Sequence, residues 1–195
     1  MTTKTTTVIV GGVAGGMSTA ARLRRRDETM DIIVLEASGH VSFANCGLPY
    51  HVSGVIPERR SLLLQTPESL AARFNLDVRV NTRATAIDRE QQTVTNDTGD
   101  TIAHDHPVLS PGATPIIPPI PGIERALHLR TIEDVDAIIA ALTDDVASVA
   151  IIGGGFIGLE VAENMRHRGL DVTVIERAPQ ILTPLDEEMA AIVEK

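Results

Sequence analysis

Hydrophobic residues near the start of the chain follow the order of a βαβ unit. The β-branched run at residues 8–10 ends in glycines, and residues 17–26 place small and apolar side chains at helical spacing. A second apolar run, at residues 32–35, ends at Glu36. Strand, glycine turn, helix and strand in this order predict two parallel strands joined by a right-handed crossover.

The same order returns late in the chain. An apolar run at residues 149–152 precedes a glycine turn, residues 156–168 have helical spacing, and Gly169 follows as the helix C-cap. The apolar run at residues 172–175 then ends at Glu176. The first glycines of the two turns lie 142 positions apart (153 − 11). We therefore expect an α/β protein that contains an internal duplication.

The segment that follows the first unit has a different pattern. Residues 66–74 are expected to form a helix, because a threonine cap and a proline stand at its start. Residues 76–110 contain short, partly alternating apolar stretches, with a turn at residues 96–100. This pattern predicts a small antiparallel β insertion.

A proline-rich segment separates the two units. Five prolines occur among residues 111–121, where they cannot continue a helix or a central strand. We place a domain boundary there, which gives one domain at residues 1–118 and a second at residues 119–195. A helix over residues 131–142 is expected to open the second domain.

The second glycine turn fits a dinucleotide. Residues 153–158 follow the pattern G-x-G-x-x-G, which brings backbone amides at a helix start to a pyrophosphate. Glu176 lies 18 positions after Gly158, near where a carboxylate binds the adenosine ribose hydroxyls. The glutamate favours NADH over NADPH because it would repel a 2′-phosphate, although the adjacent Arg177 weakens that inference.

The first glycine turn, residues 11–16, is less regular. Val13 stands where the second glycine of the pattern belongs, so a glycine-rich turn without a ligand is one interpretation. Glu36, however, lies 20 positions after Gly16 at the end of the second strand, as a ribose ligand should. A small change in the backbone path could accommodate the valine.

Composition and charge narrow the range of partners. The chain has 195 residues, of which 22% are charged, and a net charge of −9, which disfavours nucleic acid and anionic membranes as partners. The basic run at residues 22–26 is either a solvated helix face or an anion site. A single cysteine rules out an internal disulfide and fits a reducing compartment. With no signal peptide or membrane span recognised, the expected location is the cytoplasm.

Cys46 is the candidate reactive group. It lies in a polar loop flanked by glycine and proline, where reactive groups are often held, although most free cysteines are small core residues. His51 could donate a proton, but a surface helix position is the simpler interpretation. His104 and His106 flank Asp105 without a third ligand nearby, so no metal site is expected.

Four segments in this order resemble the FAD-dependent pyridine nucleotide-disulfide oxidoreductases: residues 8–26, 42–54, 109–115 and 149–176. The chain is most similar to the single-cysteine branch, and within it to the coenzyme A disulfide reductases. The discriminating motif surrounds Cys46, where Asn45 replaces the serine typical of the related NADH oxidases and peroxidases. The Gly-Gly-Val-Ala-Gly-Gly form of the first turn, valine included, is also usual in the reductase branch.

The resemblance implies a fold of two Rossmann-like domains, each incomplete, with the antiparallel insertion in the first. It also implies roles for individual residues. The residues expected to bind FAD are Gly11, Gly12, Ala14, Gly15, Gly16 and Glu36, with Ser110, Pro111, Gly112 and Ala113 passing close to it. Those expected to bind NAD(P)H are Gly153, Gly155, Gly158 and Glu176, with Ile157 and Glu160 towards the nicotinamide. Those expected to bind coenzyme A are Ser18, Arg22, Arg25, Ser42 and Asn45, the arginines through bidentate contacts with phosphate.

The activity that the resemblance implies is NAD(P)H-dependent reduction of coenzyme A disulfide, with Cys46 alternating between thiolate and mixed disulfide. An NADH oxidase or peroxidase that uses a cysteine sulfenic acid is the alternative enzyme. Family members are longer homodimers, so the chain resembles an N-terminal fragment. A catalytically silent fragment that at most binds nucleotide is therefore a third hypothesis.

Overall fold

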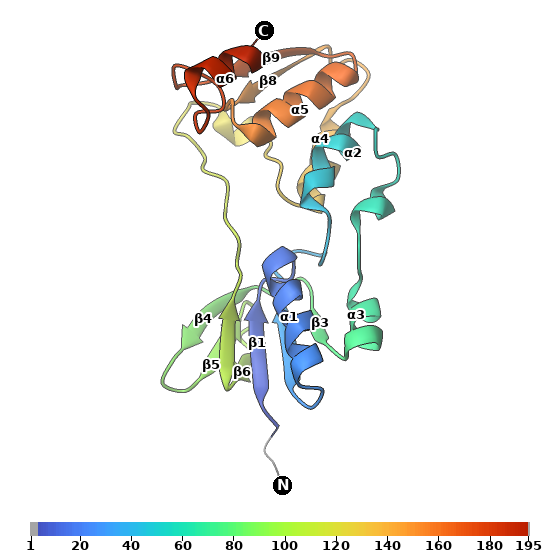
Figure 1. The fold of residues 1–195 in the computed structure, drawn as a ribbon, viewed down its shortest axis with the longest axis vertical. Helices are drawn as coiled ribbons and strands as arrows, with labels where there is room; N and C mark the ends of the chain where they lie inside the picture. Colours follow the sequence, from blue (N-terminus) through green and yellow to red (C-terminus); the bar gives the residue numbers. More distant parts are fainter. Residues whose placement is uncertain (1–3, 195) are drawn as a thin grey trace. The chain divides into compact units, whose positions relative to one another are not determined.

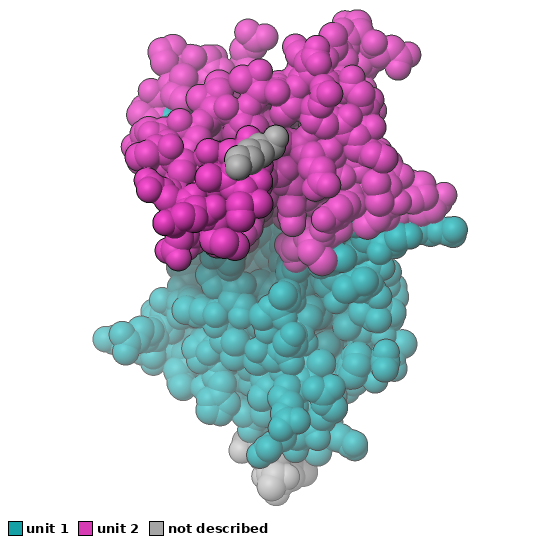
Figure 2. All heavy atoms as spheres, turned by 45° about the horizontal axis from the view of Figure 1, so that its top comes forward, with its two compact units in different colours: residues 1–44, 60–118 teal, residues 45–59, 119–195 magenta. Residues whose placement is uncertain are grey.

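The computed structural model describes residues 4–194. The chain forms two compact units, which Figure 2 colours teal and magenta. The first unit consists of residues 1–44 and 60–118, and the second of residues 45–59 and 119–195. The loop that carries Cys46 therefore belongs to the second unit.

A parallel sheet lies at the centre of the first unit (Figure 1). Its strand order is β3-β2-β1-β7, and every neighbouring pair is parallel. The strands are β1 (Thr6–Val10), β2 (Asp31–Leu35), β3 (Asp77–Arg79) and β7 (His106–Leu109). The βαβ unit predicted at the start of the chain is confirmed, with its helix α1 extending over Ala14–Arg26.

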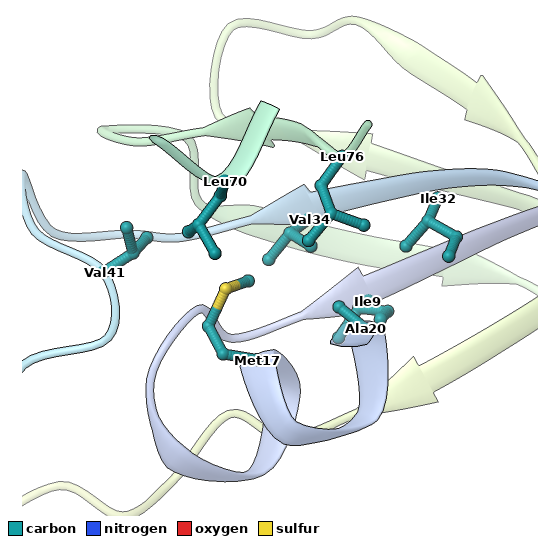
Figure 3. Packing of buried hydrophobic residues seen from close by; sticks show 8 residues of the cluster. All are labelled: Ile9, Met17, Ala20, Ile32, Val34, Val41, Leu70 and Leu76. Carbon is teal, nitrogen blue, oxygen red and sulfur yellow. The ribbon is translucent and has the colours of Figure 1, made fainter. Parts of the chain in front are cut away.

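The two faces of this sheet are covered by different elements. Figure 3 shows the cluster on the helical side, where residues of α1 and of α3 (Pro67–Phe74) pack on β1 and β2. Its buried members are Ile9, Met17, Ala20, Ile32, Val34, Val41, Leu70 and Leu76. On the other face, Val8 and Leu35 pack with Val94 of an antiparallel sheet. Strand β1 is therefore buried on both sides, as parallel strands usually are.

The antiparallel insertion is smaller than the sequence predicted. It consists of β4 (Ala84–Asp88), β5 (Thr93–Asn96) and β6 (Thr101–Ala103), in the order β4-β5-β6. The expectation that all of residues 76–110 join it was wrong, because β3 and β7 pair in parallel with β2 and β1. Val78 and Val108 of these two strands pack against the main core, which holds them in the parallel sheet.

The second unit repeats the βαβ order with fewer strands. β8 (Ser148–Ile152) and β9 (Asp171–Ile175) form a two-stranded parallel sheet joined by α5 (Phe156–His167). Helix α6 (Glu187–Val193) follows β9, and α4 (Ile132–Ala141) precedes β8. The internal duplication predicted from the sequence is therefore present, although among the described residues β8 has a paired strand on one side only.

Residues 45–59 pack with the second unit through helix α2 (Leu48–Ser53) and two arginines. Arg59 donates to both carboxylate oxygens of Asp136 on α4, at 2.8 and 2.7 Å. Arg168, just after α5, donates to the carbonyl oxygen of Val52 at 2.7 Å. These contacts attach the Cys46 loop to the elements of the second unit. None of the helices formed within residues 4–194 is long and apolar enough to cross a membrane.

Candidate functional site

The first glycine turn is closed by tight backbone contacts. Gly11 has a φ of 104°, a left-handed conformation that favours glycine, and its N–H donates to the carbonyl of Leu35 at 2.8 Å. A methyl group on Gly11 would lie 2.0 Å from the carbonyl oxygen of Ser110, which follows β7. A methyl group on Gly16 would lie 1.7 Å from the carbonyl oxygen of Gly11. The turn therefore requires glycine at both ends.

Glu36 holds the middle of this turn. Its side chain is buried, with 8% of its surface exposed, and Oε2 accepts from the N–H of Gly12 at 2.7 Å. Oε1 accepts from both the N–H and the hydroxyl of Ser38, each at 2.8 Å. A carboxylate offers about four acceptor positions, so these three bonds leave one position for a further donor. The adenosine ribose contact of Glu36 stays a prediction.

The second turn has the same construction. Gly153 has a φ of 107°, and its N–H donates to the carbonyl of Ile175 at 2.8 Å. Glu176 accepts from the N–H of Gly154 through Oε2 and from that of Ala178 through Oε1, each at 2.7 Å. The amides of Ala178 and Gly154 lower the pKa of the Glu176 carboxyl, which is therefore negatively charged at neutral pH.

The third position of the two turns explains the irregular first fingerprint. Gly155 has a φ of −79° and a ψ of −178°, a backbone conformation open to any residue, and a methyl group there would meet no atom within 4 Å. Val13, at the equivalent position, has a φ of −105°. The protein itself thus places no demand for glycine at position 155, and a valine occupies the equivalent position of the first turn with a negative φ. Any demand for glycine at this position would come from a bound ligand.

The helices that follow the two turns begin differently from the other long helices. Helices α3 and α4 have capping boxes, built by Thr66 with Ser69 and by Thr131 with Asp134, and acidic residues in their first turns. Helices α1 and α5 have neither a side-chain cap nor an acid in the first turn. Their first amides therefore lack the side-chain acceptors that α3 and α4 have. Amides without such acceptors at a helix start can donate to an anion such as a phosphate.

The basic run on α1 divides into two groups. Arg24 is buried and donates to the carbonyl oxygens of Phe74 and Asn75, at 2.8 and 2.9 Å, and of Glu28 at 2.8 Å. Its role is structural. The residues expected to bind coenzyme A, by contrast, are exposed and follow one another along one face of the helix: Ser18, Arg22 and Arg25.

The remaining residues of the expected substrate site lie in both units. Ser42, in the first unit, has a left-handed backbone with a φ of 48°. Asn45 and Cys46 form a short 3-10 turn (Asn45–Gly47) in the second unit, and both are exposed. The alternative that Cys46 is a buried core residue was therefore wrong. Its redox role stays a prediction.

The other assigned residues lie after β7 or on α5. Ser110 continues β7 through a bond from its N–H to the carbonyl of Val10 at 2.8 Å, and residues 111–113 after it are exposed. Ile157 is exposed at the start of α5, whereas Glu160 is half-buried one turn later. In the part of the chain that the structure describes, no group of three His, Cys, Asp or Glu side chains is arranged to hold a metal ion.

Sequence reasoning missed a second contact to each turn. The N–H of Ser42 donates to the carbonyl of Gly12, and that of Leu182 donates to the carbonyl of Gly154, both at 2.9 Å. Both donors lie six positions after the turn's glutamate and have a φ of 48°. The equal spacing could have indicated the pair, but a left-handed leucine could not be expected from the sequence.

Comparison with known proteins agrees with this architecture. The family model for the pyridine nucleotide-disulphide oxidoreductases matches residues 5–195. A coenzyme A disulfide reductase of Staphylococcus epidermidis is 38% identical over 188 residues, which are 93% of this chain and 43% of that protein. An NADH oxidase of Methanocaldococcus jannaschii is 35% identical over 196 residues, covering 96% of this chain and 44% of that protein.

A solved structure extends the comparison to three dimensions. The crystal structure of reduced CoADR-RHD from Bacillus anthracis matches with a TM-score of 0.93 and 49% identity, over 98% of this chain and 36% of that one. The chain thus spans less than half the length of each of these three relatives. The predicted α/β fold with two Rossmann-like units is confirmed.

Proposed function

The chain belongs to the pyridine nucleotide-disulphide oxidoreductases, and on this premise we propose that it is the nucleotide-binding part of an enzyme that reduces coenzyme A disulfide with NAD(P)H. One observation carries the proposal. The chain has two glycine turns of the same geometry, each held by a glutamate and each followed by a helix without a side-chain cap. This repetition supports two dinucleotide sites.

FAD is assigned to the first turn and NAD(P)H to the second. At the first turn we assign FAD to Gly11, Gly12, Ala14, Gly15, Gly16, Glu36, Ser110, Pro111 and Gly112. At the second we assign NAD(P)H to Gly153, Gly155, Ile157, Gly158, Glu160 and Glu176. The flavin, when bound, supplies the two-electron link between a nicotinamide and a disulfide. The charge on Glu176 supports NADH over NADPH, because a 2′-phosphate at the ribose would face a carboxylate.

Cys46 is assigned as the redox thiol and coenzyme A disulfide as its substrate. The thiolate attacks one sulfur of the disulfide, forms a mixed disulfide with one coenzyme A, and releases the other coenzyme A as a thiol. Exposure of Cys46 permits this attack, and the exposed Arg22 and Arg25 suit the phosphates of the substrate. We also assign Ser18, Ser42 and Asn45 to coenzyme A binding, following the resemblance of the Cys46 motif to the reductase branch.

A second candidate function is an NADH oxidase, since one of the relatives has that name. In that case Cys46 would be oxidised by a peroxide to a sulfenic acid, with release of water. We further propose that the enzyme is cytoplasmic and homodimeric, as its lone cysteine and the resembled branch suggest.

The test is the mass of the Cys46 adduct. After incubation of the chain with coenzyme A disulfide, we expect the mass of one coenzyme A to be added at Cys46, and none in Cys46→Ser. A parallel incubation with peroxide that added oxygen, while the disulfide left Cys46 unchanged, would favour the oxidase instead. Failure of the wild-type chain to bind NADH in titrations would contradict the whole proposal.

A further inference from the structure

The second glycine of each turn is held through both its N–H and its carbonyl. At the first turn, the N–H of Gly12 donates to Glu36 at 2.7 Å and its carbonyl accepts from Ser42 at 2.9 Å. At the second turn, the N–H of Gly154 donates to Glu176 at 2.7 Å and its carbonyl accepts from Leu182 at 2.9 Å. We call this paired contact the glycine clasp. The N–H and the carbonyl of one residue belong to successive peptide planes, so each clasp fixes the two planes that flank its glycine.

Apolar side chains close each clasp. A methyl group on Gly12 would lie 2.8 Å from Cγ1 of Val41, and one on Gly154 would lie 2.7 Å from Cγ2 of Ile181. The residue after each of these side chains adopts a left-handed backbone, which is unfavourable for serine and more so for leucine. Such strain persists only where the surroundings over-determine the conformation. The clasp is therefore a specific construction rather than a chance contact.

Most side chains around the two clasps differ. Ser38, which binds Glu36, corresponds to Ala178, and Ser42 corresponds to Leu182. Both turns share the glutamate, the glycine, and the backbone N–H groups two and six positions after the glutamate, with a carboxylate oxygen at the same distance from the glycine nitrogen. The carboxylate is the polar side chain common to both clasps, and the other shared hydrogen bonds come from the backbone.

The clasp lies directly before the helix start. Gly12 is followed by Val13 and α1, and Gly154 by Gly155 and α5, so the orientation of the clasped glycine and its two flanking peptides sets the path of the amides that open each helix. We propose that Glu36 and Glu176 are positioning residues for the phosphate end of the nucleotide, acting through the glycine clasp, in addition to any contact with ribose. This inference rests on the proposed nucleotide-binding function.

The negative charge of the glutamate should weaken phosphate binding, whereas its hydrogen bond in the clasp should strengthen it. A carboxylate close to an anion site repels the anion, so removal of its charge should by itself raise the affinity for a phosphate group. A hydrogen bond between Glu176 and the ribose should not matter to a ligand without ribose hydroxyls. Disruption of the clasp, in contrast, should lower the affinity for any dinucleotide, because the helix amides would no longer be held in place.

The experiment uses the second turn of the 195-residue chain. The variants are Glu176→Ala, Glu176→Gln and, as a control that removes one negative charge from an exposed position of α5, Glu163→Gln. The ligands are NADH and a form of it whose adenosine ribose lacks both hydroxyl groups. Amide hydrogen exchange at Gly154 is measured by NMR without ligand, and unfolding curves show that each variant folds.

We expect exchange at Gly154 to accelerate about tenfold in Glu176→Ala, and the affinity for the deoxygenated ligand to fall by about the same factor. Glu176→Gln keeps one acceptor oxygen and should give an intermediate result, which also serves if the alanine variant does not fold. Glu163→Gln should bind both ligands like the wild type.

Two results would overturn the inference. Unchanged exchange at Gly154 in both Glu176 variants would show that the carboxylate does not hold the peptide. Equal or tighter binding of the deoxygenated ligand by these variants, with weaker binding of NADH, would restrict Glu176 to the ribose and leave the proposed function intact. Failure of the wild-type chain to bind NADH would instead overturn the proposed function, and this inference with it.

Discussion

Glycines within one turn can differ in how much space surrounds them, and Gly158 and Gly155 differ most clearly. A methyl group on Gly158 would lie 2.1 Å from the carbonyl oxygen of Gly153, while one on Gly155 would meet nothing within 4 Å. Gly158→Ala must therefore displace backbone, and we expect it to destabilise the second unit by roughly 2 kcal/mol or more. Gly155→Ala should stay within about 0.5 kcal/mol of the wild type. Urea unfolding of the two variants measures the difference, and equal stabilities would contradict the geometry of the turn.

Because a side chain at position 155 would meet no protein atom, a substitution there tests ligand binding without disturbing the fold. Gly155→Val should fold, because the backbone conformation suits a side chain, but should lose nicotinamide nucleotide binding, since the side chain would occupy the place of the pyrophosphate. The affinity for FAD should be the same as in the unmodified chain, because Gly155 belongs to the other βαβ unit. Separate titrations of both proteins with NADH and with FAD measure the two affinities. Equal losses would mean that the two sites are not independent.

That prediction has a natural comparison in the first turn, where Val13 already occupies the equivalent position. If Gly155→Val kept full NADH affinity, a valine at the third position of the turn would be compatible with either ligand. The identity of that residue would then not decide which nucleotide each turn binds. The glutamates that hold the two turns would be their main common feature for nucleotide binding.

At the scale of elements, Arg24 connects the ends of two helices. It lies in the last turn of α1, is 8% exposed, and donates to the carbonyls that follow α1 and end α3. The carbonyl of Phe74, the last residue of α3, is among the groups that a helix leaves without partners, and that of Glu28 lies in the loop after α1. Arg24→Met should cost roughly 3 kcal/mol of stability, because it removes several charge-assisted hydrogen bonds together.

The matched control is Arg26→Met, which removes an exposed arginine from the same helix turn and should change the stability by less than about 0.5 kcal/mol. Thermal unfolding monitored by circular dichroism compares the two variants. A similar small effect of both would show that the buried guanidinium contributes no more than an exposed one.

The elements that the sequence predicted best are those with a strong period. Both βαβ units and the helix capped at Thr66 were predicted to within a few residues. Helix α1 begins at Ala14, earlier than expected, because packing overrides the poor helix propensity of Gly15 and Gly16. Strand β7 was misassigned because it is short and contains Pro107, and it joins the parallel sheet at an edge, where proline is tolerated.

The candidate site was predictable only as far as sequence patterns reach. Glycine spacing and the terminal glutamates indicated two nucleotide turns, and the geometry of both supports that prediction. The hydrogen bonds from Ser42 and Leu182 could not be predicted, because they depend on a left-handed backbone that neither residue favours. The burial of Arg24 was likewise invisible in a run of similar arginines.

At the scale of the molecule, the two units differ in how completely their sheets are covered. Strand β1 pairs with β2 and β7, whereas β8 pairs, within residues 4–194, with β9 alone. Ile152 and Ile175, at the ends of β8 and β9, remain 50% and 53% exposed. An open strand edge beside apolar side chains is a surface on which chains associate.

The 195-residue chain should therefore associate in solution, and it should hold FAD weakly or not at all, because it spans less than half of its relatives' length. Its net charge of −9 opposes association, so added salt should promote association by screening this repulsion.

The variant Ile152→Lys places a charge at the end of β8 and should shift the chain towards the monomer. Light scattering during size-exclusion chromatography, at low and high salt, measures these effects together with the flavin absorbance. A yellow, monodisperse monomer with stoichiometric FAD would contradict the prediction, since it would show that neither the open edge of β8 nor the limited length of the chain affects the folded protein.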